Sequence, residues 1–336
     1  MSHYTTWEKN MQAPQNAGAA GELSVFLDDR SATGRVRPWR EKKIANELLA
    51  IAYDSVNPDK AARLRGCGSY LSFAVQPDGE KRLVGMESCR VRLCPLCAWR
   101  RSLKVYANTM AILDYMDKHG EYAYIFLTLT MKNCASSDLS NALDSILSAW
   151  GRLRKREEFS QAVKGWYRGL EVTHNKNPLS QDYDTYHPHL HCLIAVNPSY
   201  FTGRTYLSQA RWTQLWKDVL RVDYTPIVDV RRVKGNRAAD VAEAAKYAAK
   251  EADYIIPDDW DLTLETVETL DAAFDHRRFV AYGLAMLEAK RALALDDEET
   301  GDLVNIDGKP EISADSRVVT YYWYTGYRQY CIGDMM

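Results

Sequence analysis

Residues 186–196 read YHPHLHCLIAV and place His187, His189 and His191 at every second position, followed by an apolar run. In a β-strand, side chains two residues apart point to the same face, so the three imidazoles would share one side of a sheet. Pro188 is tolerated because it falls at the start of the run. Neutral imidazole is the side chain that most often binds metals. The stretch therefore predicts a strand with a metal-binding face, and a polar face bonded to solvent is the alternative.

The neighbouring sequence predicts an antiparallel sheet. Residues 167–175, YRGLEVTHN, form a second predicted strand, and the polar stretch 176–185 joins the two strands into an antiparallel hairpin. Helices and further strands interleave with this hairpin, which predicts an α+β fold with helices on one face of an antiparallel sheet. The other predicted strands are 122–131 and 227–233, and the predicted helices are 38–56, 99–120, 137–159, 207–220, 237–255, 263–274 and 277–294.

Charge is uneven along a nearly neutral chain. The formal net charge of -2 and a pI near 6.4 give no overall sign of a nucleic-acid-binding protein. Residues 81–104 nevertheless hold seven Lys or Arg against one Glu, and residues 296–302 hold five acids and no base. Local basic runs can bind phosphates, and a solvated charged face is the alternative for each of them. The candidate DNA contacts are Arg90, Arg92, Arg100, Arg101, Arg231, Arg232, Lys246 and Lys250.

The sequence favours a cytoplasmic protein. The N-terminal residues lack a basic start followed by an apolar core, so they do not resemble a signal peptide. No apolar run reaches the length of a membrane span. In a reducing compartment, the seven cysteines indicate metal binding or burial and not disulfides.

Four of these cysteines lie close together in the sequence. Cys94 and Cys97 form a C-x2-C knuckle, which aims two thiolates at one ion, and Cys67 and Cys89 can complete a tetrahedral structural zinc site. A redox-active C-x-x-C pair is the alternative, but that motif usually opens a helix in a βαβ unit. The isolated cysteines, which we expect to be packed in the interior, are Cys134, Cys192 and Cys331.

A predicted helix over 238–252 carries the candidate nucleophile. Glu243, Tyr247 and Glu251 fall at i, i+4 and i+8, on one helical face. A tyrosine packed beside surface Glu–Lys pairs is the alternative. A phenol, with a pKa of about 10, attacks phosphorus only with the help of a cation and a nearby carboxylate or lysine. Glu171, on the neighbouring strand, can add an oxygen ligand to the imidazoles, and such a set suits Mn²⁺ or Mg²⁺.

Five motifs together resemble the rolling-circle replication initiators of small plasmids, members of the HUH endonuclease superfamily. They are FLTLT, LEVTHN, HPHLHCLI, AEAAKYAAKEADY and the cysteine motif CRVRLCPLCAWRRSLK, which precedes the nuclease in one branch of that family. The resemblance begins near residue 61 and ends in the aromatic tail VVTYYWYTGYRQY. With the sequence pattern, it divides the chain into an N-terminal arm and helix (1–60), a zinc-binding module (61–104), an HUH core (105–256) and a C-terminal helical and aromatic-tail region (257–336).

The resemblance also implies the metal ligands of the nuclease. His189 and His191, with Leu190 between them, correspond to the HUH pair that ligates the divalent ion. Glu171 is similar to the acidic third ligand of related nucleases. His187 is an extra histidine that either ligates the ion or flanks it.

The implied reaction centres on Tyr247. This tyrosine would cut one DNA strand at the origin, keep the 5′-phosphate as a phosphotyrosine and free a 3′-OH as primer. Glu243 would activate water for the terminating cleavage, so that strand transfer and rejoining complete the cycle. A two-tyrosine scheme with Tyr254 is the alternative.

The resemblance further implies partners. The origin DNA would be single-stranded or a hairpin at the nick site, and a host helicase would unwind it, since the chain has no Walker-type glycine loop. A single-strand-binding protein and a second copy of the chain are further candidate partners. Rival functions are transposition or conjugation with the same chemistry, a DNA-binding regulator, and a three-histidine zinc hydrolase. Aromatic residues expected in the core, with base stacking as the alternative, are Trp150, Tyr167, Tyr186, Trp212 and Trp216.

Overall fold

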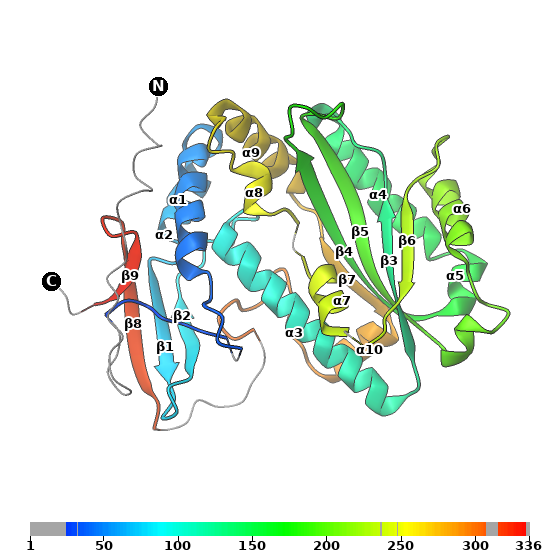
Figure 1. Cartoon of the computed structure of the whole chain (residues 1–336), viewed down its shortest axis with the longest axis horizontal. Coiled ribbons are helices and arrows are strands. Elements are labelled where there is room, and N and C mark those ends of the chain that lie inside the picture. The colour runs from blue at the N-terminus through cyan, green and yellow to red at the C-terminus, as the bar shows by residue number, and fades with distance from the viewer. Residues whose placement is uncertain (1–24, 32, 236, 247, 307–314, 334–336) are drawn as a thin grey trace.

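Two antiparallel sheets and the helices around them make up the described part of the chain (Figure 1). The structure is a computed structural model, and it describes residues 25–31, 33–235, 237–246, 248–306 and 315–333. The predicted α+β class, with helices packed on antiparallel strands, is confirmed.

The five-stranded sheet is built around the predicted hairpin. The two strands of this hairpin pair antiparallel, with Glu171 directly opposite His189 and Gly169 opposite His191. Alternation places Leu190, Cys192 and Ile194 on the opposite face, where they are buried. In spatial order the strands are β6 (Val228–Arg232), β3 (Ala123–Thr130), β5 (Thr185–Val196), β4 (Val163–Asn175) and β7 (Val280–Leu284).

Helices cover both faces of this sheet, so the expectation of one covered face is wrong. Leu127 of β3 belongs to one apolar cluster, together with residues of α4 (Leu139–Leu153) and α6 (Gln209–Leu220). Its neighbour Phe126 points the other way, into a second cluster. Both faces need cover because β3 is apolar on each of them. The helices that contribute to the second cluster are α3 (Pro95–His119), α7 (Arg237–Ala244) and α10 (Ala285–Ala292).

Two predicted helices outside the histidine site are interrupted. Within 277–294, residues 280–284 form β7 and pair with Gly165–Gly169 of β4 before α10 begins. Within 137–159, the chain breaks after α4 and resumes as a short helix. Further helices are α1 (Trp39–Val56), α5 (Glu157–Ala162), α8 (Glu251–Tyr254), α9 (Trp260–Phe274) and the 3-10 turns η1 (Ser136–Asp138) and η2 (Pro198–Phe201), of which η2 was not predicted.

The four-stranded sheet joins the two ends of the described chain. The aromatic tail forms two of its strands, and Tyr322 pairs with Tyr70 near the cysteines. The long helix α3 lies between the two sheets (Figure 1). The predicted division into four regions stays a prediction, and this pairing brings two of the regions into one sheet. The elements are α2 (Pro58–Gly66), β1 (Tyr70–Val75), β2 (Lys81–Met86), β8 (Arg317–Tyr324) and β9 (Gln329–Ile332).

Candidate active site and cysteine cluster

Glu171, His189 and His191 converge on one face of the β4–β5 hairpin. All three side chains are buried, and one ligand atom from each lies within 4.8 Å of the others. Glu171 Oε2 is 3.3 Å from His189 Nε2 and 3.1 Å from His191 Nε2. The strand register causes this convergence, because directly opposite residues in an antiparallel pair share a face.

The surroundings keep the carboxylate charged and the imidazoles oriented. Burial would raise the pKa of Glu171, but hydrogen bonds from His189 and His191 outweigh it and hold that pKa below its usual range. His189 Nδ1 donates to the carbonyl of His187 at 3.1 Å, and His191 Nδ1 lies 3.4 Å from Thr128 Oγ1. With the Nδ1 atoms held in this way, both Nε2 atoms are aimed at the same point as the carboxylate.

His187 lies outside this group. Its Nδ1 atom is 2.7 Å from Asn133 Oδ1, and its side chain is half-buried. Burial, together with the neighbouring His189, lowers its pKa. Of the two roles considered for His187, ligating the ion or flanking it, these contacts fit the flanking role.

The predicted continuous helix over 237–255 is wrong. Helix α7 ends at Ala244 and α8 begins at Glu251. Ala248, between them, has a positive φ of 28° and forms a parallel bridge with Glu171 of β4. This tertiary pairing overrides the helix propensity of an Ala- and Lys-rich stretch. The predicted one-face stacking of Glu243 and Glu251 on a single helix is therefore absent.

Glu243 nevertheless faces the metal-capable group. Its Oε1 atom lies 4.0 Å from His191 Nε2, and its carboxylate forms an ion pair with Lys246. Tyr247 lies outside the described residues. The residue after it, Ala248, accepts a hydrogen bond of 2.7 Å from the backbone of Val172, next to Glu171 in sequence.

Tyr254 has no access to this site. Only 1 % of its surface is exposed, and its hydroxyl donates to the carbonyl of Leu93, beside the cysteines. Burial raises its pKa well above the usual range. The two-tyrosine alternative therefore has no support from the position of Tyr254.

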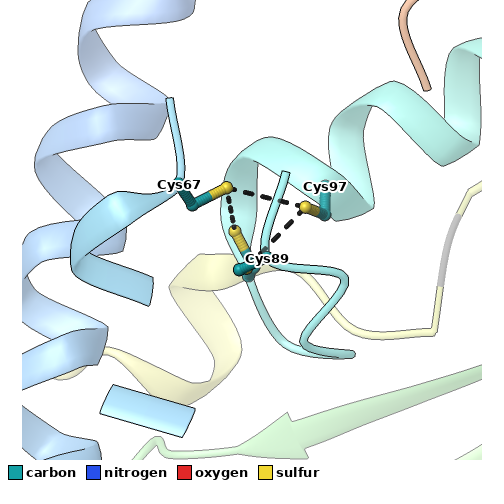
Figure 2. A group of neighbouring side chains, drawn as sticks. Cys67, Cys89 and Cys97 are labelled. Atoms are coloured by element: carbon teal, nitrogen blue, oxygen red, sulfur yellow. Dashed lines mark hydrogen bonds between the residues drawn. The ribbon is translucent and has the colours of Figure 1, made fainter. Parts of the chain in front are cut away.

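The four predicted zinc ligands form a second group. Figure 2 shows Cys67, Cys89 and Cys97 pointing toward one another from separate segments. The Sγ atom of Cys67 lies 3.5 Å from that of Cys94 and 3.6 Å from that of Cys97, and Cys89 Sγ lies 3.8 Å from Cys97 Sγ. All four thiols are buried and free of disulfides. Asn46 of α1 also donates to Cys94 Sγ at 3.3 Å.

Both groups have donor sets that fit a metal ion. Four convergent thiols match a closed tetrahedral site of the structural zinc type. Two imidazole nitrogens and one carboxylate oxygen match a cation that keeps open positions for substrate. The chain therefore has two potential metal centres of different chemical character, one saturated by sulfur and one open.

Residues 80–331 match a protein family described as Replication protein. The chain belongs to this family. It is 36 % identical over 338 residues to a Protein rep of Bacillus amyloliquefaciens, covering 91 % of this chain and 97 % of that protein. It is also 36 % identical to a Protein rep of Lactiplantibacillus plantarum (84 % and 90 % covered) and 33 % identical to one of Streptococcus pneumoniae (88 % and 92 % covered). No solved structure matches. The resemblance to plasmid replication initiators is confirmed.

Four predicted DNA contacts of this replication protein are engaged with other parts of its own chain. Arg100 donates to the carbonyls of Leu303 and Val304 and is 2 % exposed. Arg101 is also buried and donates to the carbonyl of Arg90. Because both side chains are buried, the guanidinium groups of Arg100 and Arg101 cannot contact a phosphate.

Arg90 and Arg92 contact the acidic segment, residues 296–302, directly. Arg90 is exposed and donates to the carbonyl of Thr300 at 2.6 Å. Arg92 forms an ion pair with Glu299. The loop after α10 thus supplies hydrogen-bond acceptors and a carboxylate to several arginines of the cysteine module.

The remaining predicted contacts, apart from Arg232, lie on or beside the site face. Arg231 packs over Phe126, with its guanidinium carbon 4.4 Å from the ring centroid. Arg232 is paired with Ile125 on the other face, and its guanidinium carbon lies 4.4 Å from the ring centroid of Phe201. Lys250 Nζ lies 3.5 Å from Glu171 Oε1, and Lys246 pairs with Glu243. The buried aromatic residues, for which the core role is confirmed, are Trp150, Tyr167, Tyr186, Trp212 and Trp216.

Sequence reasoning missed the contributions of Thr128 and Asn133. It assigned no site role to the FLTLT strand, yet Thr128 sits opposite His191 and contacts its ring. Asn133, just after β3, contacts His187. The alternation of Thr128 and Thr130 with leucines marks a polar face, and that pattern is the signal that could have found them.

Among the described residues, no helix is both long and apolar enough to cross a membrane.

Proposed function

We propose that this protein nicks one strand of a plasmid double-strand origin through Tyr247 and so initiates rolling-circle replication. The supporting observation is that Glu171, His189 and His191 converge while Glu243 lies 4.0 Å from His191. The chain segment that directly follows Tyr247 is hydrogen-bonded beside Glu171. A metal-capable group, a carboxylate and the residue that follows Tyr247 thus lie close together around Glu171.

In the proposed cleavage, the phenolic oxygen of Tyr247 attacks the scissile phosphorus. A bond forms between that oxygen and phosphorus, and the bond from phosphorus to the 3′-oxygen breaks. The phenol loses its proton, and the 3′-oxygen takes one up to become the primer hydroxyl. Glu171, His189 and His191 would hold Mn²⁺ or Mg²⁺, which polarises a phosphate oxygen when bound. The cationic Lys250, beside Glu171, is placed to offset the charge of the attacked phosphate.

Glu243 is the proposed base of the terminating step. Its carboxylate faces His191, and it can take a proton from water once Lys246 releases it. Strand transfer and rejoining need no nucleotide cofactor, because the phosphotyrosine is itself a phosphodiester. The transfer of the phosphotyrosine-linked strand to a new 3′-hydroxyl would make the protein a strand transferase as well as an endonuclease.

The proposed partners follow from this reaction. Origin DNA would bind single-stranded or as a hairpin at the nick site. A host helicase would unwind the duplex, and a single-strand-binding protein and a second copy of the chain are the other candidates. The reaction would take place in the cytoplasm.

The cysteines are proposed as a structural zinc site. Their four sulfurs converge in the interior, where a bound Zn²⁺ would join α2, the segment before Cys94 and the start of α3. A closed sulfur site holds chain segments together and leaves no position for substrate.

The proposal is tested with a labelled single-stranded origin oligonucleotide and Mn²⁺. We expect a protease-sensitive covalent adduct with the unmodified protein and none with Tyr247→Phe. Glu243→Ala should retain the first cleavage and impair termination. Tyr327→Phe, at a tyrosine that is 70 % exposed, is the matched control and should form the adduct normally. An adduct that persists in Tyr247→Phe would reject Tyr247 as the nucleophile, and its absence on every origin would favour a DNA-binding regulator.

A further inference from the structure

The segment that follows Tyr247 is hydrogen-bonded to β4 and to the residue just after that strand. The amide of Val172 donates to the carbonyl of Ala248, and His174 Nδ1 donates to the carbonyl of Asp253 at 3.1 Å. Two residues further along the chain, Lys176 donates to the carbonyl of Ala252. Val172 thus contacts this segment through its backbone amide, and His174 and Lys176 contact it through their side chains.

The same segment is bonded to the cysteine side of the molecule. The Tyr254 hydroxyl donates to the carbonyl of Leu93 at 2.5 Å, and Leu93 immediately precedes Cys94. Glu251 forms an ion pair with Lys42 of α1. The four residues of α8 are therefore held from two sides, by β4 and by the cysteine module with α1.

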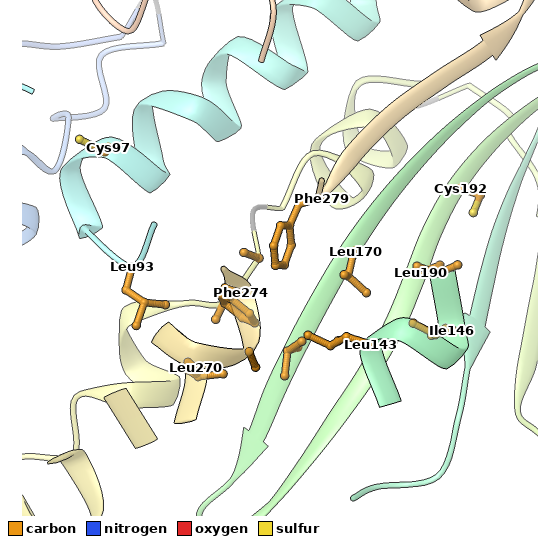
Figure 3. Close-up of a cluster of buried hydrophobic side chains, with 14 of the residues drawn as sticks. Leu93, Cys97, Leu143, Ile146, Leu170, Leu190, Cys192, Leu270, Phe274 and Phe279 are labelled. Carbon is orange, nitrogen blue, oxygen red and sulfur yellow. The ribbon is translucent and has the colours of Figure 1, made fainter. Parts of the chain in front are cut away.

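The Leu93 carbonyl is a fixed point. Cys94 donates its amide to the carbonyl of Val91 at 3.2 Å, which closes a turn at the start of α3. The Leu93 side chain is buried in the cluster that contains Leu270 and Phe274 of α9 (Figure 3). The position of this carbonyl thus depends on the cysteine turn and on a shared apolar core.

We propose that Tyr254 is a positioning residue, through which the cysteine module holds residues 248–254 against β4 beside Glu171. Its role in the reaction rests on the proposed function, whereas the docking itself does not. A phenylalanine would fill the same buried space, so the positioning is attributed to the hydrogen bond from the Tyr254 hydroxyl to the carbonyl of Leu93. Lys42 adds an electrostatic contact at the other end of α8.

Limited trypsin digestion measures the docking directly. Lys246 and Lys250 lie just before α8, and cleavage after them reports opening of the segment. Removing one hydrogen bond to a buried acceptor should speed this cleavage about tenfold in Tyr254→Phe. The matched control is Tyr330→Phe, because Tyr330 is buried and donates to the carbonyl of Gly68 at 2.7 Å, on the far side of the cysteines from α8. We expect unchanged cleavage at both lysines in this control.

Single-turnover adduct formation measures the consequence for the reaction. In Tyr254→Phe the rate should fall about tenfold, while the Kd for the origin oligonucleotide is unchanged, since positioning affects the reacting geometry. Charge reversal by Lys42→Glu should lower the rate, and Lys42→Glu combined with Glu251→Lys should restore it. Tyr330→Phe should match the unmodified protein.

The outcomes separate this proposal from the function on which it rests. Equal trypsin cleavage in Tyr254→Phe and the unmodified protein would overturn the docking role. Faster cleavage with an unchanged adduct rate would overturn the positioning role. If the unmodified protein forms no adduct on any origin, the proposed nuclease function fails, and the trypsin comparison still decides whether Tyr254 docks the segment.

Discussion

The carboxylate of Glu171 and the imidazole of His191 come from neighbouring strands, and their Oε2 and Nε2 atoms lie 3.1 Å apart. His189 lies directly opposite Glu171 and adds its Nε2 atom at 3.3 Å. The hairpin register and the Nδ1 contacts of both histidines together bring these donor atoms close to one another. Donor atoms that the fold itself holds together avoid an ordering cost on binding.

Replacing Glu171 with Gln should weaken Mn²⁺ binding by about tenfold or more, because the only anionic donor of the group becomes neutral. Calorimetric titration of Mn²⁺ measures the change. Glu158→Gln is the control, because the Glu158 side chain is 37 % exposed and pairs with Arg211 of α6 at 2.7 Å. Equal Mn²⁺ affinity in Glu171→Gln and Glu158→Gln would show that Glu171 is not a ligand.

Replacing Cys94 with Ser should remove bound zinc and lower the thermal midpoint. A structural site contributes its binding free energy to folding, so losing one thiolate weakens the whole cysteine module. Atomic absorption gives the zinc content, and circular dichroism gives the midpoint. Cys134→Ser is the matched control, since Cys134 is half-buried beside the carbonyl of Tyr186 and outside the cluster. Full zinc content in Cys94→Ser protein would contradict the assignment.

Acid should weaken the loop that joins α10 to the cysteine module. Burial would raise the pKa of Asp297, but the bond from Arg278 and the amides of Thr300 and Glu299 lower it below its usual range. A lowered folded-state pKa stabilises the protein above the unfolded pKa of about 3.9, and this contribution is lost as pH falls below that value.

Asp297→Asn should therefore be less stable than the unmodified protein at pH 7, and the difference should shrink below about pH 4. Urea midpoints followed by tryptophan fluorescence measure it. Asp218→Asn, at an exposed aspartate of α6, should leave the midpoint nearly unchanged at pH 7. A difference between Asp297→Asn and the unmodified protein that stays constant with pH would contradict the prediction.

Local pattern was enough to predict the hairpin and its metal-capable face. His189 and His191 alternate with buried Leu190 and Cys192, and a period of two specifies a strand and its faces. The cysteine group was also predictable, because four thiols within a short span of sequence have few other uses in a reducing compartment.

The features that local sequence pattern could not predict depend on contacts between residues far apart in the sequence. Residues 280–284 have helix-compatible periodicity but are recruited as an edge strand by Gly165–Gly169. The helix over 237–255 breaks because Ala248 pairs with Glu171. Likewise, the basic run and the acidic segment looked like independent surfaces, and only folding brings Lys104 within 2.5 Å of Asp296. Each of these outcomes depends on a partner far away in the sequence.

Arg231 is the basic residue best placed to guide DNA toward the metal-capable group. Its guanidinium lies over Phe126, whose ring centroid is 5.6 Å from that of His191, and its side chain is 45 % exposed despite an ion pair with Asp240. Arg231→Ala should weaken oligonucleotide binding to a similar degree for all sequences. It should also reduce the slope of log K against log salt by about 0.7, the contribution of one phosphate contact on a single strand.

Fluorescence anisotropy at several salt concentrations measures that slope. Arg211→Ala is the matched control, because Arg211 is an exposed arginine of α6 that pairs with Glu158, and α6 packs against the opposite face of the sheet. Arg100→Ala should instead lower the thermal midpoint, since its buried guanidinium satisfies two backbone carbonyls. An unchanged salt slope in Arg231→Ala, or an equal change in Arg211→Ala, would place the DNA path away from β6.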